Sequence, residues 1–163
     1  MKSRIRYMTL AGIFCAMTFV FTAYLHIPVY TGYAHIGDGF IYLAACLLPL
    51  PYGIFVGGIG AFLADMLTGY MMWAPASLVI KSLTVIFFSR NAKRVVCVRN
   101  ILALIPAWLL CIGGYYFYEG IITGNFISPL ASVTGNIIQS SLSTVVFIVV
   151  GVIIDKLNKE NNL

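Results

Sequence analysis

Long apolar segments separated by short polar breaks recur along almost the whole chain. Their positions predict six helices, at residues 8–27, 40–51, 53–69, 74–89, 101–118 and 129–155. The first run, MTLAGIFCAMTFVFTAYLHIPV, has the length of a membrane span and lacks the cleavage pattern of a signal peptide, so we interpret it as a retained helix. The second helix is short for a span, and LPLPYG turns it sharply into the third, so two crossings and a re-entrant pair both fit.

Composition places this pattern in a lipid bilayer. The chain has 163 residues, of which 61% are hydrophobic and 9% are charged, and its mean hydropathy is +0.96. Ordinary soluble domains carry roughly 25% charged residues. Because no segment of different composition interrupts the chain, we expect residues 1–163 to form a single membrane domain. The predicted fold class is an all-α integral membrane protein with a six-transmembrane-helix bundle.

The basic residues indicate the orientation of that bundle. Lys and Arg gather before the first helix, in the loop 90–99 and after the last helix. The positive-inside rule then predicts a multi-pass protein of the plasma membrane with both termini cytoplasmic, and it places residues 28–39, 70–73 and 119–128 outside. The net charge of +5 follows from this topology. A nucleic-acid partner is not expected, since no base-stacking module accompanies the basic residues.

A polar segment, YAHIGDGF, lies on the outer side between two apolar helices. It has two readings: a tight glycine turn in which Asp38 caps the next helix, or part of a binding site. Aromatic residues gather at the same boundary, where an interfacial belt is one explanation. The inner boundary has only Tyr7 and Tyr52, and this asymmetry favours an aromatic-lined outer pocket. The outer set is Tyr24, Tyr30, Tyr33, Tyr70, Trp73, Tyr115, Tyr116 and Tyr118.

Two ionisable residues lie within predicted spans at matching depth. Asp65 precedes the end of the third helix and Lys81 follows the start of the fourth, which places both roughly 7–10 Å below the outer surface. Charged side chains inside a span normally pair with each other or face a wet cavity. The sequence therefore allows an Asp65–Lys81 ion pair, or a Lys81 that contacts a ligand while Asp65 holds it in place.

The outer half of the last helix carries a polar stripe. Asn136 and Gln139 are three residues apart and share one face, and Ser140 and Ser143 extend it. Hydrogen bonding between helices would explain the stripe, and so would an amide site for a heterocycle.

Small residues on the first helix allow close contact with another helix. Ala11 and Cys15 are four residues apart, as are Gly12 and Ala16. Such spacing lets helices approach closely in lipid, within the chain or against a partner subunit.

Known catalytic and metal-binding signatures are missing from the sequence. It has no HExxH, GxSxG or P-loop motif, and its histidines have no cysteine or carboxylate cluster suited to a metal. We therefore expect no enzyme activity, catalytic residue, metal or cofactor, and we read the four cysteines as small buried residues. The chain also lacks the length and inverted repeats of the usual secondary transporters, which indicates that it works as part of a larger assembly.

The segment HIGDGFIYLAACLLPLPYGIFVGGIGAFLADMLTGYMMWAPASLVIKSL, the small-residue first helix and the amide-bearing sixth helix together resemble a known family. They are similar to the substrate-binding S components of energy-coupling factor (ECF) transporters, in the branch with hydroxymethylpyrimidine, pyridoxine and riboflavin-type proteins. The resemblance covers essentially the whole chain.

The resemblance implies a subunit that captures a small vitamin-like heterocycle from outside. It also implies partners, a membrane T component and two ATPase subunits, besides the lipid bilayer. In the family an AxxxA face on the first helix meets the T component; here the second alanine is replaced by cysteine, so the expected contact set is Ala11, Gly12, Cys15 and Ala16. The substrate-binding residues expected are His35, Asp38, Trp73, Lys81, Tyr116, Glu119, Asn136 and Gln139. The alternatives are a self-sufficient small-solute carrier and a membrane assembly or enzyme-accessory protein.

Overall fold

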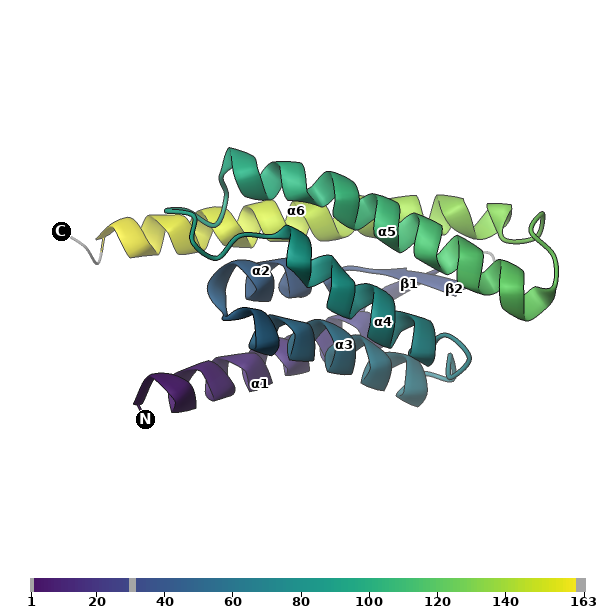
Figure 1. The fold of residues 1–163 in the computed structure, drawn as a ribbon, viewed down its shortest axis with the longest axis horizontal. Helices are drawn as coiled ribbons and strands as arrows, with labels where there is room; N and C mark the ends of the chain where they lie inside the picture. The colour runs from purple at the N-terminus through teal and green to yellow at the C-terminus, as the bar shows by residue number, and fades with distance from the viewer. Residues whose placement is uncertain (1, 30–31, 161–163) are drawn as a thin grey trace.

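The computed structural model describes residues 2–29 and 32–160, in which helices form an elongated bundle with one short hairpin (Figure 1). The elements in chain order are α1 (Lys2–Ala23), β1 (His26–Val29), β2 (Gly32–His35), α2 (Asp38–Leu47), α3 (Leu50–Leu67), α4 (Ala74–Thr84), the 3₁₀ turn η1 (Val85–Phe87), α5 (Val98–Thr123) and α6 (Leu130–Glu160). Both termini and the loop 88–97 lie at one end, the terminal end. The hairpin and the loops 68–73 and 124–129 lie toward the other, the hairpin end.

Helix lengths support a membrane protein and separate two classes of helix. Within the described residues, α1, α3, α5 and α6 are long and apolar enough to cross a bilayer. Asp38–Leu47 and Ala74–Phe87 are apolar but shorter. At ~1.5 Å per residue the ten residues of α2 reach about 15 Å, half of a ~30 Å hydrocarbon layer. The all-α membrane class is thus confirmed, whereas the number of crossings stays a prediction.

Most helix boundaries differ from the sequence-based ones by a few residues, and three of the differences lie at the ends of α1, α5 and α6. The first helix ends at Ala23, because the chain then enters an antiparallel hairpin in which His26 pairs with His35. The fifth helix runs to Thr123, where Gly124 ends it with a left-handed φ of 64° that glycine adopts without a steric penalty. Glu119, expected in a loop, is therefore helical. The sixth helix extends to Glu160 rather than 155.

The short helix α2 forms the centre of the bundle. Every residue from Asp38 to Cys46 is buried, and α2 packs against α1, α3 and α6. Below its first turn, the ring of Tyr42 stacks on Phe88 at a centroid distance of 5.0 Å, and Phe147 meets Phe88 at 5.7 Å. This apolar core fixes α2, so the polar residues at its start are held in one place.

Glycines bring α3 and α4 into close contact. A Cβ atom on Gly57 would lie 2.6 Å from the backbone oxygen of Lys81, and one on Gly58 would lie 2.4 Å from Oγ of Ser82. Small residues permit such an approach between helices in lipid. The close packing sets Asp65 of α3 beside the first turns of α4.

Candidate functional site

A cavity opens at the hairpin end of the bundle. It encloses about 560 Å³, counting the open space at its mouth. The hairpin, α3, α4, α5 and α6 all contribute to its wall. The lining residues are Val29, Tyr33, His35, Asp65, Trp73, Ser77, Tyr115, Glu119, Ala131, Ser132, Gly135, Asn136 and Gln139.

Asp65 connects the hairpin to the helices around this cavity. The Tyr33 hydroxyl of β2 donates to Asp65 Oδ1 at 2.5 Å, and the Ser77 hydroxyl of α4 donates to Oδ2. Ser77 Oγ lies 2.6 Å from the hydroxyl of Tyr115 on α5. One carboxylate thus joins three elements, and the Asp65–Lys81 ion pair considered from the sequence is wrong.

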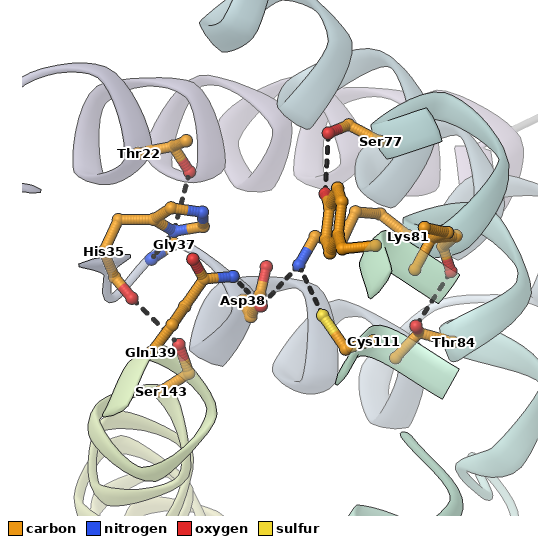
Figure 2. A network of polar contacts seen from close by, with 12 residues as sticks. Thr22, His35, Gly37, Asp38, Ser77, Lys81, Thr84, Cys111, Gln139 and Ser143 are labelled. Atoms are coloured by element: carbon orange, nitrogen blue, oxygen red, sulfur yellow. Dashed lines mark hydrogen bonds and ion pairs between the residues drawn. The ribbon is translucent and has the colours of Figure 1, made fainter. Parts of the chain in front are cut away.

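Lys81 pairs instead with Asp38. Its Nζ lies 2.7 Å from Asp38 Oδ2 and 3.0 Å from Sγ of Cys111, and the Lys81 and Asp38 side chains are each 1% exposed (Figure 2). Gln139 Nε2 donates to the same Asp38 oxygen at 3.0 Å. Hydrogen bonds of this kind offset the cost of removing an ion pair from water. The capping role considered for Asp38 is wrong, since α2 starts at Asp38 itself and has no side-chain cap.

His35 lies on the other side of Gln139 in the same network (Figure 2). Its Nδ1 accepts from the backbone N–H of Gly37 at 3.2 Å and lies 3.4 Å from Thr22 Oγ1, while its backbone oxygen accepts from Ser143. Burial lowers the pKa of His35 to about 4, against the opposing effect of Asp38. The ring is therefore uncharged at neutral pH, with its proton on Nε2.

Glu119 and Asn136 form the wall that α5 and α6 contribute. The Glu119 side chain is buried, and its Oε2 accepts from the Ser132 hydroxyl at 2.5 Å. Asn136 lies about one helical turn beyond Ser132 on α6. At the mouth, the ring of Trp73 contacts that of Tyr118 at 5.9 Å between centroids.

The cavity brings together five of the eight residues expected from the sequence: His35, Trp73, Glu119, Asn136 and Gln139. Asp38 and Lys81 are absent from its lining and belong to the buried network beside it. Tyr116 points elsewhere: its hydroxyl donates to the backbone oxygen of Phe126 at 2.8 Å. Its neighbour Tyr115 lines the cavity in its place. Tyr30, part of the outer aromatic set, lies outside the described residues.

The expected site set omitted five polar lining residues: Tyr33, Asp65, Ser77, Tyr115 and Ser132. Tyr33 and Asp65 were noticed as an aromatic residue and an intramembrane charge, but no local pattern joins them across 32 positions. Ser77 lies four residues before Lys81 and hence on its face of α4, which is the one signal that could have indicated it.

The small residues of α1 divide into two faces. Ala11 is 3% exposed and packs inside the subunit with Ala44, Leu48 and Val56. Cys15 is half-buried beside this cluster. Gly12 and Ala16 are exposed, and a Cβ on Gly12 would meet nothing within 4 Å.

Residues 2–29 and 32–160 contain four free cysteines. No group of three His, Cys, Asp or Glu side chains in that part of the chain could hold a metal ion. Cys46 and Cys111 are buried, as the sequence suggested, whereas Cys15 and Cys97 are only half-buried.

Residues 2–156 match the family described as ECF-type riboflavin transporter, S component. The chain therefore belongs to this family of substrate-binding transporter components, which is not a family of enzymes. The match confirms the resemblance seen in the sequence.

A relative is found in Pyrococcus woesei, described as "Uncharacterized protein in gap 3'region". It is 47% identical over 55 residues, which cover 34% of this chain and 36% of the relative. The aligned region thus spans well under two thirds of that relative's length.

Proposed function

We propose that this chain is the substrate-capture subunit of an ATP-driven ECF vitamin importer. The observation that carries the proposal is the cavity at the hairpin end, which combines three aromatic rings, two amides and two carboxylates in a chain of the S component family. Aromatic faces suit stacking on a flat heterocycle, and the polar groups suit its ring nitrogens and substituents. The substrate is a small vitamin or vitamin precursor.

The orientation follows the basic residues. We place the terminal end, with the loop 88–97, in the cytoplasm and the hairpin end outside the plasma membrane, with six passes through or into the bilayer. The cavity mouth then faces the medium from which a nutrient is taken. Cysteine labelling tests this: a cysteine at Lys93 should react only from inside and one at Asn125 only from outside. The reverse pattern would contradict the orientation.

The hairpin acts as the cover of the site in this proposal. Val29, Tyr33 and His35 all line the cavity, and the Tyr33–Asp65 hydrogen bond ties β2 to α3. Release of that contact, together with the Ser143 and Thr22 contacts of His35, would free one wall while α2 and its apolar core stay in place. Substrate would enter by this route and be enclosed when these contacts form again.

The proposed partners are a T component and two ATPase subunits, and the proposed contact is the Gly12/Ala16 face of α1. This choice follows from exposure, because Ala11 is already covered by its own chain whereas Gly12 and Ala16 are open. Small exposed residues on an apolar helix allow a helix of a partner subunit to approach closely.

Reconstitution tests the function. The subunit, T component and ATPases in proteoliposomes should take up a vitamin only with ATP, and Gly12→Trp should abolish uptake and copurification while the isolated subunit still binds ligand. Ile13→Trp is the matched control, since Ile13 is 51% exposed on the adjacent face. ATP-independent flux by the subunit alone would support a self-sufficient carrier and contradict the proposal.

A further inference from the structure

The charged groups that line the cavity are carboxylates. Asp65 and Glu119 contribute to its wall, and across residues 2–29 and 32–160 no Lys or Arg side chain does so. His35 adds no positive charge at neutral pH, because burial lowers its pKa to about 4. The lining can therefore carry two negative charges with nothing in the wall to balance them.

Lys81 does not provide the missing positive charge. Its ammonium group is 1% exposed and is held by Asp38 and Cys111 (Figure 2). The Asp38 carboxylate balances it directly at 2.7 Å. A ligand in the cavity would thus meet a neutral pair on this side and, on the other, carboxylates that are bonded to hydroxyl groups rather than to a cation.

Hydrogen bonding points in the same direction. Gln139 donates through Nε2 to Asp38, so its amide oxygen is turned away from that carboxylate, as Figure 2 shows. Asp65 and Glu119 accept hydrogen bonds from hydroxyl groups and retain further acceptor positions, since an ionised carboxylate has about four. The two carboxylates give the wall acceptor positions that suit donor groups on a bound molecule.

We propose that the cavity selects a nitrogen heterocycle that carries an amino group or a positive charge and no phosphate, with that group directed to Asp65 and Glu119. The proposal rests on the proposed function and specifies its substrate class. A buried carboxylate attracts a cation far more strongly than it would in water. A phosphate ester would place like charges together, which costs an interface several powers of ten in affinity at close range.

The test is calorimetric titration of the purified subunit, freed of bound molecules, with three groups of probes. The amino or cationic probes are thiamine, pyridoxamine and 4-amino-5-hydroxymethyl-2-methylpyrimidine. The neutral probes are pyridoxine and riboflavin. The phosphorylated probes are thiamine monophosphate, pyridoxamine 5′-phosphate and flavin mononucleotide. We expect the tightest binding from an amino or cationic probe and at least about 30-fold weaker binding of its phosphate ester.

The outcomes separate the two proposals. Riboflavin or pyridoxine as the tightest probe, or a phosphate ester that binds as well as its parent, would overturn the substrate class and leave vitamin capture intact. Binding of no probe by folded subunit, with no small molecule retained in native mass spectrometry, would overturn both.

Charge-removing variants locate the selectivity. Glu119→Gln and Asp65→Asn keep side-chain size. Each should lower the affinity for the amino or cationic probe at least about 10-fold and reduce the affinity ratio between that probe and its phosphate ester. Glu160→Gln removes the same charge from the exposed end of α6 and should change neither value. Selectivity that survives in both cavity variants would contradict the assignment to these carboxylates.

Discussion

The two ends of the bundle use polar side chains in different ways. At the hairpin end, side chains bind one another across helices, as in Lys81–Asp38–Gln139 and Tyr33–Asp65–Ser77, and they surround a cavity. At the terminal end, side chains bind the backbone of the loop 88–97. Asp155 accepts from the N–H groups of Val95 at 2.7 Å and Val96 at 2.9 Å.

Asn100 completes the loop attachment at the terminal end. It is fully buried, donates to the backbone oxygens of Ser89 and Val95, and accepts from the N–H of Ser89. These bonds satisfy loop backbone groups that would otherwise lie unpaired away from water. The difference teaches that buried polar side chains serve two purposes in this bundle. At the hairpin end they join helices around the cavity, and at the terminal end they hold a loop in place.

Breaking the Lys81–Asp38 pair should have the largest effect. Lys81→Met leaves an uncompensated carboxylate in the bundle and should cost about 3–5 kcal/mol of unfolding free energy. Denaturation of the subunit in detergent measures the loss. Lys93→Met, at an exposed loop position, should stay within about 0.5 kcal/mol.

Removal of Asp38 as well sharpens that test. The double variant Lys81→Met, Asp38→Leu contains neither charge and should recover much of the lost stability, because an apolar pair often replaces a buried ion pair at little cost. If the double variant is no more stable than Lys81→Met, the carboxylate is not the source of the loss.

The His35 ring should make the hairpin end sensitive to acid. Its pKa is about 4 in the folded protein against about 6.5 when unfolded, so the unfolded state binds the proton first as pH falls. Stability should be full above pH 6.5 and should fall by up to about 3 kcal/mol on the way to pH 4. The charged and titratable groups near the ring are Asp38, Lys81, His26 and Tyr33.

A thermal-shift series in pH measures this dependence. His35→Gln has no titrating ring, so its unfolding temperature should vary less between pH 6.5 and 4 than that of the unmodified protein. An equal pH dependence in both proteins would assign the effect to other groups.

The terminal end should affect stability without affecting capture. Asp155→Ala leaves the N–H groups of Val95 and Val96 without their partner and should cost about 1–3 kcal/mol of unfolding free energy. Calorimetry should find unchanged affinity in the folded fraction. A loss of affinity larger than about threefold would show that the two ends are coupled.

Asn136 should affect ligand binding without affecting insertion or folding. It lines the cavity, so Asn136→Ala should weaken ligand binding by about 1–3 kcal/mol while the subunit still inserts and purifies normally. Ile138→Ala, at a position that is 41% exposed on another face of α6, is the control. Unchanged affinity in folded Asn136→Ala would assign this residue to helix packing.

Hydropathy and charge were sufficient to predict the membrane class and the number of helices in the described part of the chain, whereas the family was predicted from a resemblance to known sequences. The same reasoning correctly indicated the polar stripe of α6, because i and i+3 residues share a face regardless of tertiary contacts. Boundaries next to the hairpin were less accurate, since the pairing of His26 with His35 ends α1 through a contact outside its own segment.

Charge pairing was the part that the sequence could not provide. Their matching depth in the membrane made an ion pair between Asp65 and Lys81 plausible. In the structure, the fully buried start of α2 places Asp38 next to Lys81 instead. Asp65 is then satisfied by hydroxyl groups from β2 and α4, 32 and 12 residues away. Such contacts depend on how helices are placed against each other, which a local pattern does not contain.

The central claim is that the hairpin-end cavity captures the substrate, and ligand retention in a filled-cavity variant tests it most directly. Gly135 lines the cavity, so Gly135→Phe should occupy it and displace Val29, whose Cγ2 would lie 2.7 Å from a Cβ at this position. Gly113 faces open space, so Gly113→Phe is the control. Native mass spectrometry should find the small molecule in the unmodified and Gly113→Phe subunits and lose it in a folded Gly135→Phe subunit. Equal retention in all three would contradict the account.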